Sequence, residues 1–379
     1  MLPDTRSSLP DGTGVGNGGG PRVVIAHEWL TAMGGSDKTV RAMALALPGS
    51  RLLTAVADPL LVDELLGARP VEALWTNRLP GIRRRWRPYG PAIAVAWSML
   101  RLRDTDLLIS SSHFATKAAG RRFPGPHLCY CYTPMRVAWR PDLELHRLRP
   151  AMRPVAHAVL PAVRGWDSRT AQGVTAFAGI STTVVERIRD AYGRDAECIF
   201  PPVDVAAFQA VKRGPGQYFL AFGRLIPYKR FDLAVNVCTT HDYPLVVAGA
   251  GPEEARLRAM AGPSVRFVGY VDHQQHCDLL ANATALLFPG EEDFGIVPVE
   301  AQAAGCPVVA LGKGGALDTV NDGLTGVLFP EPTEADLADG IARLLAGSWD
   351  AAAIRHWADR FSEERFRRAF LDFVAPYGR

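Results

Sequence analysis

The sequence lacks any run of about 18 or more apolar residues, the length that a membrane-spanning helix needs. Residues 1–20 are polar and glycine-rich, without the apolar core of a signal peptide, and we expect a disordered tail there. A strong charge of one sign is missing too. The formal net charge is +3 over 379 residues, too weak to indicate nucleic acid as a partner. We therefore expect a soluble protein of the cytoplasm.

Common site signatures are also missing. The six cysteines form no C-x-x-C pair, so we expect reduced, largely buried thiols and no metal site. No strand-to-helix loop carries the full G-x-G-x-x-G fingerprint, and the P-loop lysine pattern is absent. These absences argue against a dinucleotide oxidoreductase and against a P-loop ATPase.

Short apolar runs and helical patterns alternate from Arg22 onward, which predicts parallel α/β sheets. Ser181 is a good N-cap for one of the helices. Prolines and glycines without a clear period predict a linker at 201–217. Strands are predicted at 22–27, 51–57, 104–112, 127–133 and 174–180 before the linker, and at 218–224, 243–251, 265–271, 283–290 and 306–312 after it.

This alternation predicts an α/β protein of two doubly wound, Rossmann-like domains facing each other across a cleft. The N-terminal domain is expected over residues 21–205 and the C-terminal domain over residues 206–355. A terminal helix within 356–379 is expected to pack back on the N-terminal domain. Such folds bind ligands at the carboxyl ends of their strands, so the loops there are the candidate sites.

The strongest signal in such a loop is EEDFGIVPVE, residues 291–300. Pro298 suits the first position of a helix, which would place Glu292 in the loop and Glu300 near the first turn. Two carboxylates and a helix amino end would then converge on an oxygen-rich ligand. The alternative is a surface loop followed by a helix-start glutamate. The backbone amides free to donate would be those of Gly295, Ile296 and Val297.

Two cations follow the first strand of the second domain, in FGRLIPYKRFD. Arg224 ends the strand and Lys229 opens the next helix. A planar guanidinium and a point charge suit a diphosphate, although a pair of solvated cations is the alternative.

The first domain offers two further candidates. Gly34 and Gly35 lie at a helix amino end, where the backbone can approach an anion closely. His113 follows a strand end, although a lone histidine is more often structural.

Together these segments resemble the retaining glycosyltransferases of family 4, which have the two-domain GT-B fold. E-x7-E at Glu292 and Glu300, GRLIPYKR and the Gly-Gly loop are the most specific parts of the match. HEWLTAMGG, SSSHFATK and YCYTPMRVAWRPD resemble a subgroup of O-antigen-type mannosyltransferases. That subgroup usually has HDWL and YCHTPMR, so Glu28 and Tyr132 depart from it.

The resemblance implies a role for each candidate. Glu300 would bind the donor ribose and Glu292 the transferred sugar, while Arg224 and Lys229 would stabilise the leaving diphosphate. His113 would contact the sugar near the reacting carbon. The remaining donor-binding residues would be Gly34 and Gly35 at the diphosphate, Tyr270 and Val271 beside the base, and the segment Phe294, Gly295, Ile296 and Val297. The family is generally metal-independent and uses no cofactor beyond the nucleotide-sugar donor.

The subgroup implies GDP-mannose as donor and a lipid-linked or glycan acceptor in cell-envelope polysaccharide synthesis. Three alternatives remain open at this stage: a sugar-nucleotide epimerase of the same fold, a UDP-sugar-dependent transferase or synthase, and a non-catalytic binder of nucleotide sugars. An epimerase would need acid/base groups around the sugar carbon, for which only His113 is a clear candidate.

Residues 81–103 combine arginines with aromatic residues. Such a stretch suits the anionic inner face of a membrane and a lipid-linked acceptor. A solvated basic face beside a core helix explains it equally well. The residues concerned are Arg83, Arg84, Arg85, Trp86, Arg87, Tyr89 and Trp97.

Overall fold

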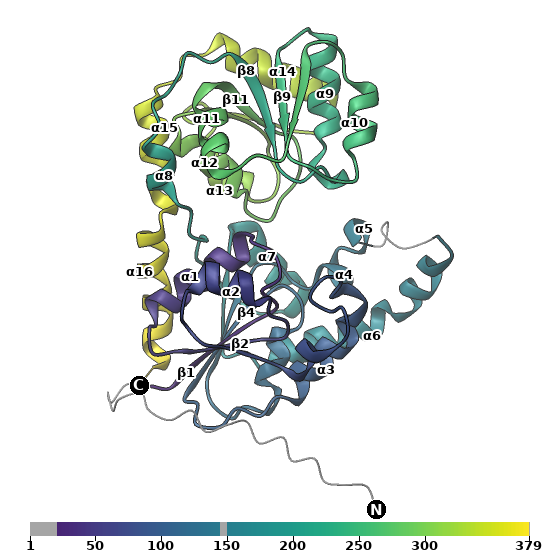
Figure 1. The fold of residues 1–379 in the computed structure, drawn as a ribbon, viewed down its shortest axis with the longest axis vertical. Helices are drawn as coiled ribbons and strands as arrows, with labels where there is room; N and C mark the ends of the chain where they lie inside the picture. The colour runs from purple at the N-terminus through teal and green to yellow at the C-terminus, as the bar shows by residue number, and fades with distance from the viewer. Residues whose placement is uncertain (1–20, 145–149, 379) are drawn as a thin grey trace, which may run out of the picture.

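The computed structural model describes residues 21–144 and 150–378, so the tail expected at residues 1–20 lies outside the described residues. The described chain forms two parallel sheets, each flanked by helices, which lie one above the other in Figure 1. This arrangement confirms the expected pair of Rossmann-like α/β domains.

The first sheet has the strand order β3-β2-β1-β4-β5-β6-β7, with every neighbouring pair parallel. Its central strands are fully buried, as parallel strands covered on both faces must be. The strands are β1 (Val23–His27), β2 (Arg51–Thr54), β3 (Val71–Ala73), β4 (Leu107–Ser112), β5 (His127–Cys131), β6 (Ala176–Gly179) and β7 (Ala196–Cys198). The helices are α1 (Gly35–Ala46), α2 (Pro59–Leu66), α3 (Gly90–Met99), α4 (Arg136–Trp139), α5 (Pro141–Glu144), α6 (Arg153–Gln172) and α7 (Thr182–Tyr192).

The second sheet has the order β10-β9-β8-β11-β12-β13 and is also parallel throughout. Its strands are β8 (Tyr218–Phe222), β9 (Leu245–Ala248), β10 (Val265–Gly269), β11 (Ala283–Phe288), β12 (Val308–Leu311) and β13 (Gly326–Phe329). Its helices are α8 (Val205–Gln209), α9 (Phe231–Thr240), α10 (Glu254–Met260), α11 (His273–Asn282), α12 (Ile296–Ala303), α13 (Ala316–Thr319) and α14 (Glu334–Ala346). Two terminal helices follow, α15 (Ala351–Ala358) and α16 (Glu363–Val374).

Local capping explains several boundaries. The Ser181 side chain accepts a hydrogen bond from Val184 N, and Gly193 ends the helix in the left-handed conformation, which confirms the predicted cap. The predicted linker 201–217 joins the last strand of the first sheet to the first strand of the second, and it contains a short helix, α8, which Asp204 caps. One other prediction was wrong. Helix α12 begins at Ile296, so Pro298 is its third residue instead of its first, because Gly295 at φ +92° already turns the chain into the helix.

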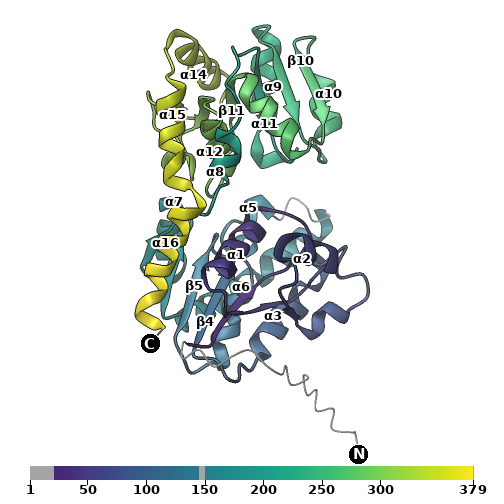
Figure 2. The ribbon, with the colours of Figure 1, turned by 60° about the vertical axis from the view of Figure 1, so that its left-hand side comes forward.

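One apolar core runs through both domains. Buried side chains from the first sheet, from α12 in the second domain and from α16 belong to the same cluster. Figure 2 shows α15 and α16 running down one side of both domains. The outer face of each sheet has a cluster of its own. Helix α16 therefore packs in the N-terminal domain, although it is the last α-helix of the described residues.

Candidate active site

Each sheet reverses its strand order at one place, which is where open α/β folds bind ligands. In the first sheet the reversal lies between β1 and β4, and in the second it lies between β8 and β11. The predicted residues follow these strands: Gly34 and Gly35 come after β1, His113 after β4, Lys229 after β8, and Glu292 after β11. The topology thus gathers residues from distant parts of the sequence at two facing strand edges.

Lys229 and the two glutamates form the centre of the site. The Lys229 Nζ donates to Glu292 Oε1 at 2.6 Å, and the Lys229 side chain is only 10% exposed. Glu300 is buried in the second turn of α12. Burial raises the pKa of Glu300 to about 7, although the charges of Lys38 and Lys229 oppose that rise. The structure therefore brings Lys229, Glu292 and Glu300 together.

The first turn of α12 points its amino end toward the same place. Gly295 is the N-cap, with no side-chain cap, so the amides of the first turn have no intrahelical acceptor. Ile296 and Val297 are half-buried there. Phe294 differs from the expectation, because its side chain is buried against Phe200 and Phe361 at ring distances of 5.9 and 5.7 Å. Only the backbone of Phe294 is available to a ligand.

The Gly-Gly loop lies directly opposite that turn. Gly34 is the N-cap of α1 and Gly35 its first residue. A Cβ placed on Gly35 would lie 2.5 Å from Cδ1 of Ile296, so the two domains touch here. The close approach that the glycine permits is thus toward the other domain in this structure.

Three other predicted residues are less enclosed. Arg224 is exposed in the loop after β8, and Tyr270 is 84% exposed after β10, at the sheet edge. Val271 beside it is half-buried. All three follow carboxyl ends of strands of the second sheet, on the side where Lys229 lies.

His113 lies among aromatic side chains. Its ring meets the edge of Trp29 at 4.7 Å and lies 6.0 Å from the Tyr132 ring. Burial lowers the pKa of His113 to about 4, although Glu28 opposes the shift. The imidazole is therefore neutral near pH 7.

Glu28 holds the loop that carries His113. The side chain is fully buried, and its Oε1 accepts hydrogen bonds from Phe114 N at 2.7 Å, Ala115 N at 2.7 Å and the Thr116 hydroxyl at 2.7 Å. The sequence showed only that a charge is kept at this position. Its partners lie more than 80 residues away, where no local pattern reveals them.

Tyr132, like Glu28, holds neighbouring segments of the first domain together. Its hydroxyl donates to the Ser36 carbonyl oxygen at 3.1 Å and contacts the Ser111 hydroxyl at 2.9 Å. It therefore ties the start of α1, next to Gly35, to the end of β4. Lys38, whose charge acts on Glu300, is another residue of this region that sequence reasoning missed.

The six cysteines are free thiols, and five of them are buried while Cys198 is exposed. Within residues 21–144 and 150–378, no group of three or more His, Cys, Asp and Glu side chains could hold a metal ion.

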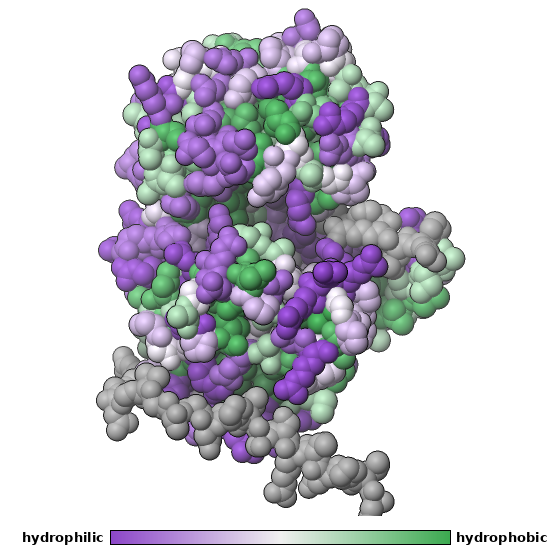
Figure 3. Space-filling model, in the orientation of Figure 1, coloured by the Kyte–Doolittle hydropathy of each residue, from purple (hydrophilic) through white to green (hydrophobic). Residues whose placement is uncertain are grey.

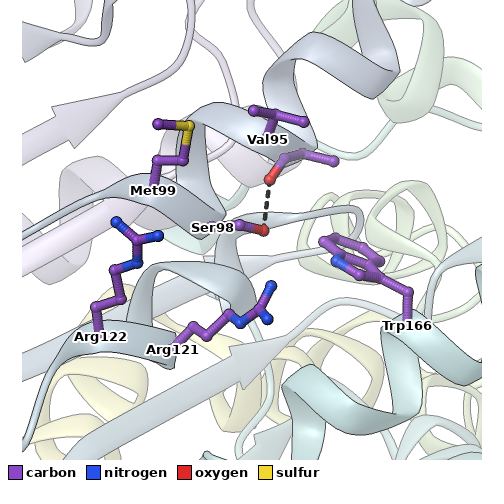
Figure 4. Close-up of a pocket in the computed structure, with 7 residues that line it drawn as sticks. Val95, Ser98, Met99, Arg121, Arg122 and Trp166 are labelled. Carbon is purple, nitrogen blue, oxygen red and sulfur yellow. Dashed lines mark hydrogen bonds between the residues drawn. The ribbon is translucent and has the colours of Figure 1, made fainter.

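A cavity of about 370 Å³ lies away from this site, between α3, α6 and the segment before β5 (Figure 4). These elements meet where the strands of the first sheet begin, at the opposite end from the site. Its lining residues are Ala94, Val95, Ser98, Met99, Arg121, Arg122 and Trp166.

Comparison with known proteins agrees with this geometry. Residues 204–359 match the family model "Glycosyl transferases group 1". The match covers about two fifths of the chain and coincides with the second domain. That domain contains Arg224, Lys229, Glu292 and Glu300.

Curated relatives cover different shares of the chain. D-rhamnosyltransferase WbpZ of Pseudomonas aeruginosa is 30% identical over 167 residues, which is 42% of each protein. A phosphatidyl-myo-inositol mannosyltransferase of Mycobacterium leprae is 40% identical, over 27% of this chain and 29% of the relative. The human α-1,3/1,6-mannosyltransferase ALG2 is 24% identical over 93% of this chain and 95% of the relative. The chain thus spans less than half the length of the first and second of these relatives.

Solved structures match nearly the whole chain. Anabaena HepE in complex with UDP has a TM-score of 0.72 at 16% identity, covering 94% of this chain and 100% of that one. The lipopolysaccharide outer core galactosyltransferase WaaB has a TM-score of 0.68 at 14% identity, covering 94% and 99%. At such identities the likeness shows the fold alone. The fold is GT-B.

Proposed function

We propose that the protein is a retaining glycosyltransferase that moves mannose from GDP-mannose to a lipid-linked or glycan acceptor. The observation that carries this proposal is the grouping of Lys229, Glu292 and Glu300 at the amino end of α12, inside the group 1 domain. Gly35 lies against Ile296 from the other domain, and the loop of His113 follows β4 of that domain. The mannosyltransferases among the relatives favour mannose over other sugars.

The charges at the site suit the cleavage of a sugar–phosphate bond. Negative charge develops on the departing diphosphate, where Lys229 and Arg224 would stabilise it, and positive charge develops on the sugar ring. Glu292, held by Lys229 at 2.6 Å, would accept hydrogen bonds from hydroxyls of the transferred sugar. Retention of configuration would follow from attack on the face of the leaving phosphate, which NMR of the product anomer would test.

The epimerase alternative is less well supported. It needs groups that add and remove a proton at the sugar carbon, and the one clear candidate is His113. Burial holds the pKa of His113 at about 4, which makes it a poor proton donor near pH 7. The relatives named above are all described as transferases. A UDP-sugar-dependent transferase of the same fold is the alternative that the donor experiment decides.

The acceptor side of the proposal includes contact with an anionic membrane at the cytoplasmic face, in cell-envelope polysaccharide synthesis. No helix in the described part of the chain is long and apolar enough to cross a bilayer. Around α3, hydrophilic side chains gather beside scattered hydrophobic ones (Figure 3). Val95 and Met99 are about half exposed on α3, at the cavity that Arg121 and Arg122 line. Cations beside exposed apolar groups suit anionic lipid, and sedimentation with anionic vesicles at low salt tests this contact.

The donor is tested by a thermal-shift and hydrolysis screen without metal against GDP-mannose, UDP-glucose, UDP-GlcNAc and ADP-glucose. A ligand that binds only the native state stabilises it by about 2.7 kcal/mol at a hundredfold excess over Kd. A selective shift with GDP-mannose and slow release of GDP are expected. A shift with a UDP-sugar would contradict GDP-mannose as the donor. No shift with any of the four would contradict the proposal that the protein is a glycosyltransferase.

A further inference from the structure

The acidic triplet Glu291-Glu292-Asp293 is shared between the two domains. Its middle member pairs with Lys229 of its own domain. Its outer members pair with arginines of the N-terminal domain. Asp293 accepts short hydrogen bonds from Arg136 and Arg187, and Glu291 Oε1 accepts from Arg187 Nη2 at 2.6 Å. The outer side chains of the triplet thus face the N-terminal domain, and the middle one faces Lys229 of the C-terminal domain.

These pairs are shielded from water more than ordinary surface ion pairs. The side chain of Asp293 is 13% exposed and that of Arg187 is 20% exposed. Burial alone would lower the pKa of Arg136, because it disfavours the charged guanidinium. The Asp293 carboxylate has the larger effect and holds the pKa of Arg136 above its usual value. The Ser181 hydroxyl also donates to the Asp293 carbonyl oxygen. Charge-assisted bonds of this kind, made by rigid guanidinium forks, fix geometry as well as adding energy.

The backbone of the triplet is held in place at Glu292 as well. Glu292 forms a strand-like bridge with Gly314, and its carbonyl oxygen accepts from Gly315 N at 2.8 Å. Arg187 donates to both Glu291 and Asp293, whereas Lys229 donates to Glu292 between them. The arginines that hold the two outer side chains therefore constrain the backbone that carries Glu292. Arg136 also lies over the Tyr228 ring at 5.8 Å, next to Lys229 in the chain.

We propose that Arg136 and Arg187 are positioning residues that orient Glu292 for the sugar only while the two domains are closed. The inference rests on the proposed function, in which Glu292 binds the transferred sugar. Opening the domains would separate both arginines from Asp293, while the pair of Lys229 with Glu292 lies within one domain and would remain. The nucleotide would then still bind to the open form, but the sugar would not be held for transfer.

Asp293→Asn and Arg187→Ala test this, with Asp318→Asn as the matched control. Asp318 crosses the same domain interface, accepting from Thr182 N and from the Thr182 hydroxyl at 2.8 Å each, without touching the triplet. Calorimetry with GDP gives the nucleotide Kd, and GDP release from GDP-mannose gives kcat. We expect D293N and R187A to lower kcat on the order of 100-fold, the cost of a misplaced group, with Kd for GDP nearly unchanged. D318N should change neither.

Two outcomes would overturn the inference. An equal loss of kcat in D318N would mean that general interface stability matters, and a parallel loss of GDP affinity in D293N would mean that the triplet supports the nucleotide. If the wild-type protein turns over no donor, the proposed function fails. Small-angle scattering then tests separately whether the contacts of Arg136 and Arg187 hold the domains closed. D293N should then show a larger radius of gyration than the wild type at low salt, and equal radii would refute the inference.

Discussion

At the scale of single residues, the two cations of the proposed donor site differ in what surrounds them. Lys229 is nearly buried beside Glu292, whereas Arg224 is exposed. Lys229→Ala would remove both the charge and the partner of Glu292. We expect a loss in rate of about 100- to 1,000-fold for either cation, typical of removing one such donor. Only Lys229→Ala should also lower the free energy of unfolding, by about 1–3 kcal/mol, because it leaves an unpaired carboxylate.

Turnover of the proposed donor and urea unfolding together check this expectation. Arg367→Ala is a matched control, since that exposed cation pairs with Glu364 far from the site on α16. It should leave both quantities unchanged, because exposed pairs contribute only about 0–1 kcal/mol. Normal turnover in both Lys229→Ala and Arg224→Ala would show that these cations do not act on a leaving group.

Glu300 should give the protein a distinctive pH dependence. Burial raises its pKa from 4.5 to about 7, so the folded state holds the proton more tightly than the unfolded chain. The stabilisation is fully present below pH 4.5 and is lost as the pH rises to about 7. At 1.36 kcal/mol per unit, the loss amounts to about 3 kcal/mol. In its proposed role at the donor ribose, Glu300 accepts hydrogen bonds from hydroxyls most strongly as a carboxylate, so affinity for GDP should rise over the same pH range.

Urea unfolding of the wild type and of Glu300→Gln between pH 4.5 and 8 measures this effect. The neutral amide of E300Q does not titrate, so E300Q should become the more stable of the two as the pH rises. A constant difference between them would place the Glu300 pKa near its ordinary value.

At the scale of elements, the amino ends of α1 and α12 meet at Gly35 and Ile296. A Cβ on Gly35 would lie 2.5 Å from Cδ1 of Ile296, so Gly35→Ala should push the two helix ends apart. Misplacement on this scale should lower turnover on the order of 10- to 100-fold. Ile296→Val removes the obstructing Cδ1, so the double variant should recover most of the activity. Continued loss in the double variant would show that the Cβ obstructs the donor instead.

The elements also show how far the sequence alone could reach. The buried central strands β1, β4, β8 and β11 were predicted, because each contains an apolar run between glycine-rich or polar loops, although β4 is apolar only in its first half. The strands that escaped prediction, β3, β7 and β13, lie at sheet edges and are three or four residues long. Strands β3 and β7 are at most partly buried and so have a weak apolar pattern, whereas β13 is mostly buried but too short to stand out. The same argument applies to α8, a single capped turn inside a proline-rich segment.

The candidate site was predictable as far as its residues follow strand ends. Lys229 and the glutamates flank β8 and β11, whose place at the strand-order reversal makes them neighbours. Glu28, Tyr132 and Asp293 each have a partner 80 or more residues away in another element, Phe114, Ser36 and Arg187 respectively, and these partners were not predictable. Such contacts depend on how distant elements pack, within one domain for Glu28 and Tyr132 and between the domains for Asp293, and no local pattern encodes that packing.

At the scale of the whole molecule, the C-terminal helices join the two domains. Helix α15 is tied to the second domain, where Trp357 Nε1 donates to the Thr319 carbonyl oxygen at 2.9 Å. Helix α16 belongs to the first, where the Phe366 ring meets the edge of Tyr130 at 5.7 Å. The domains are therefore not independent along the sequence, since α16, the last α-helix of the described residues, packs in the N-terminal domain.

This connection predicts that a change near the C-terminus loosens strands near the N-terminus. Phe370 on α16 is fully buried, and truncating such a ring costs about 3–5 kcal/mol. Phe370→Ala should therefore speed hydrogen exchange in β1 and β5, measured by mass spectrometry. Phe329→Ala is the matched control, since this equally buried ring of β13 lies in the core of the second sheet and should speed exchange there. If Phe370→Ala affected only residues 351–378, α16 would unfold separately, and the N-terminal domain would be stable without it.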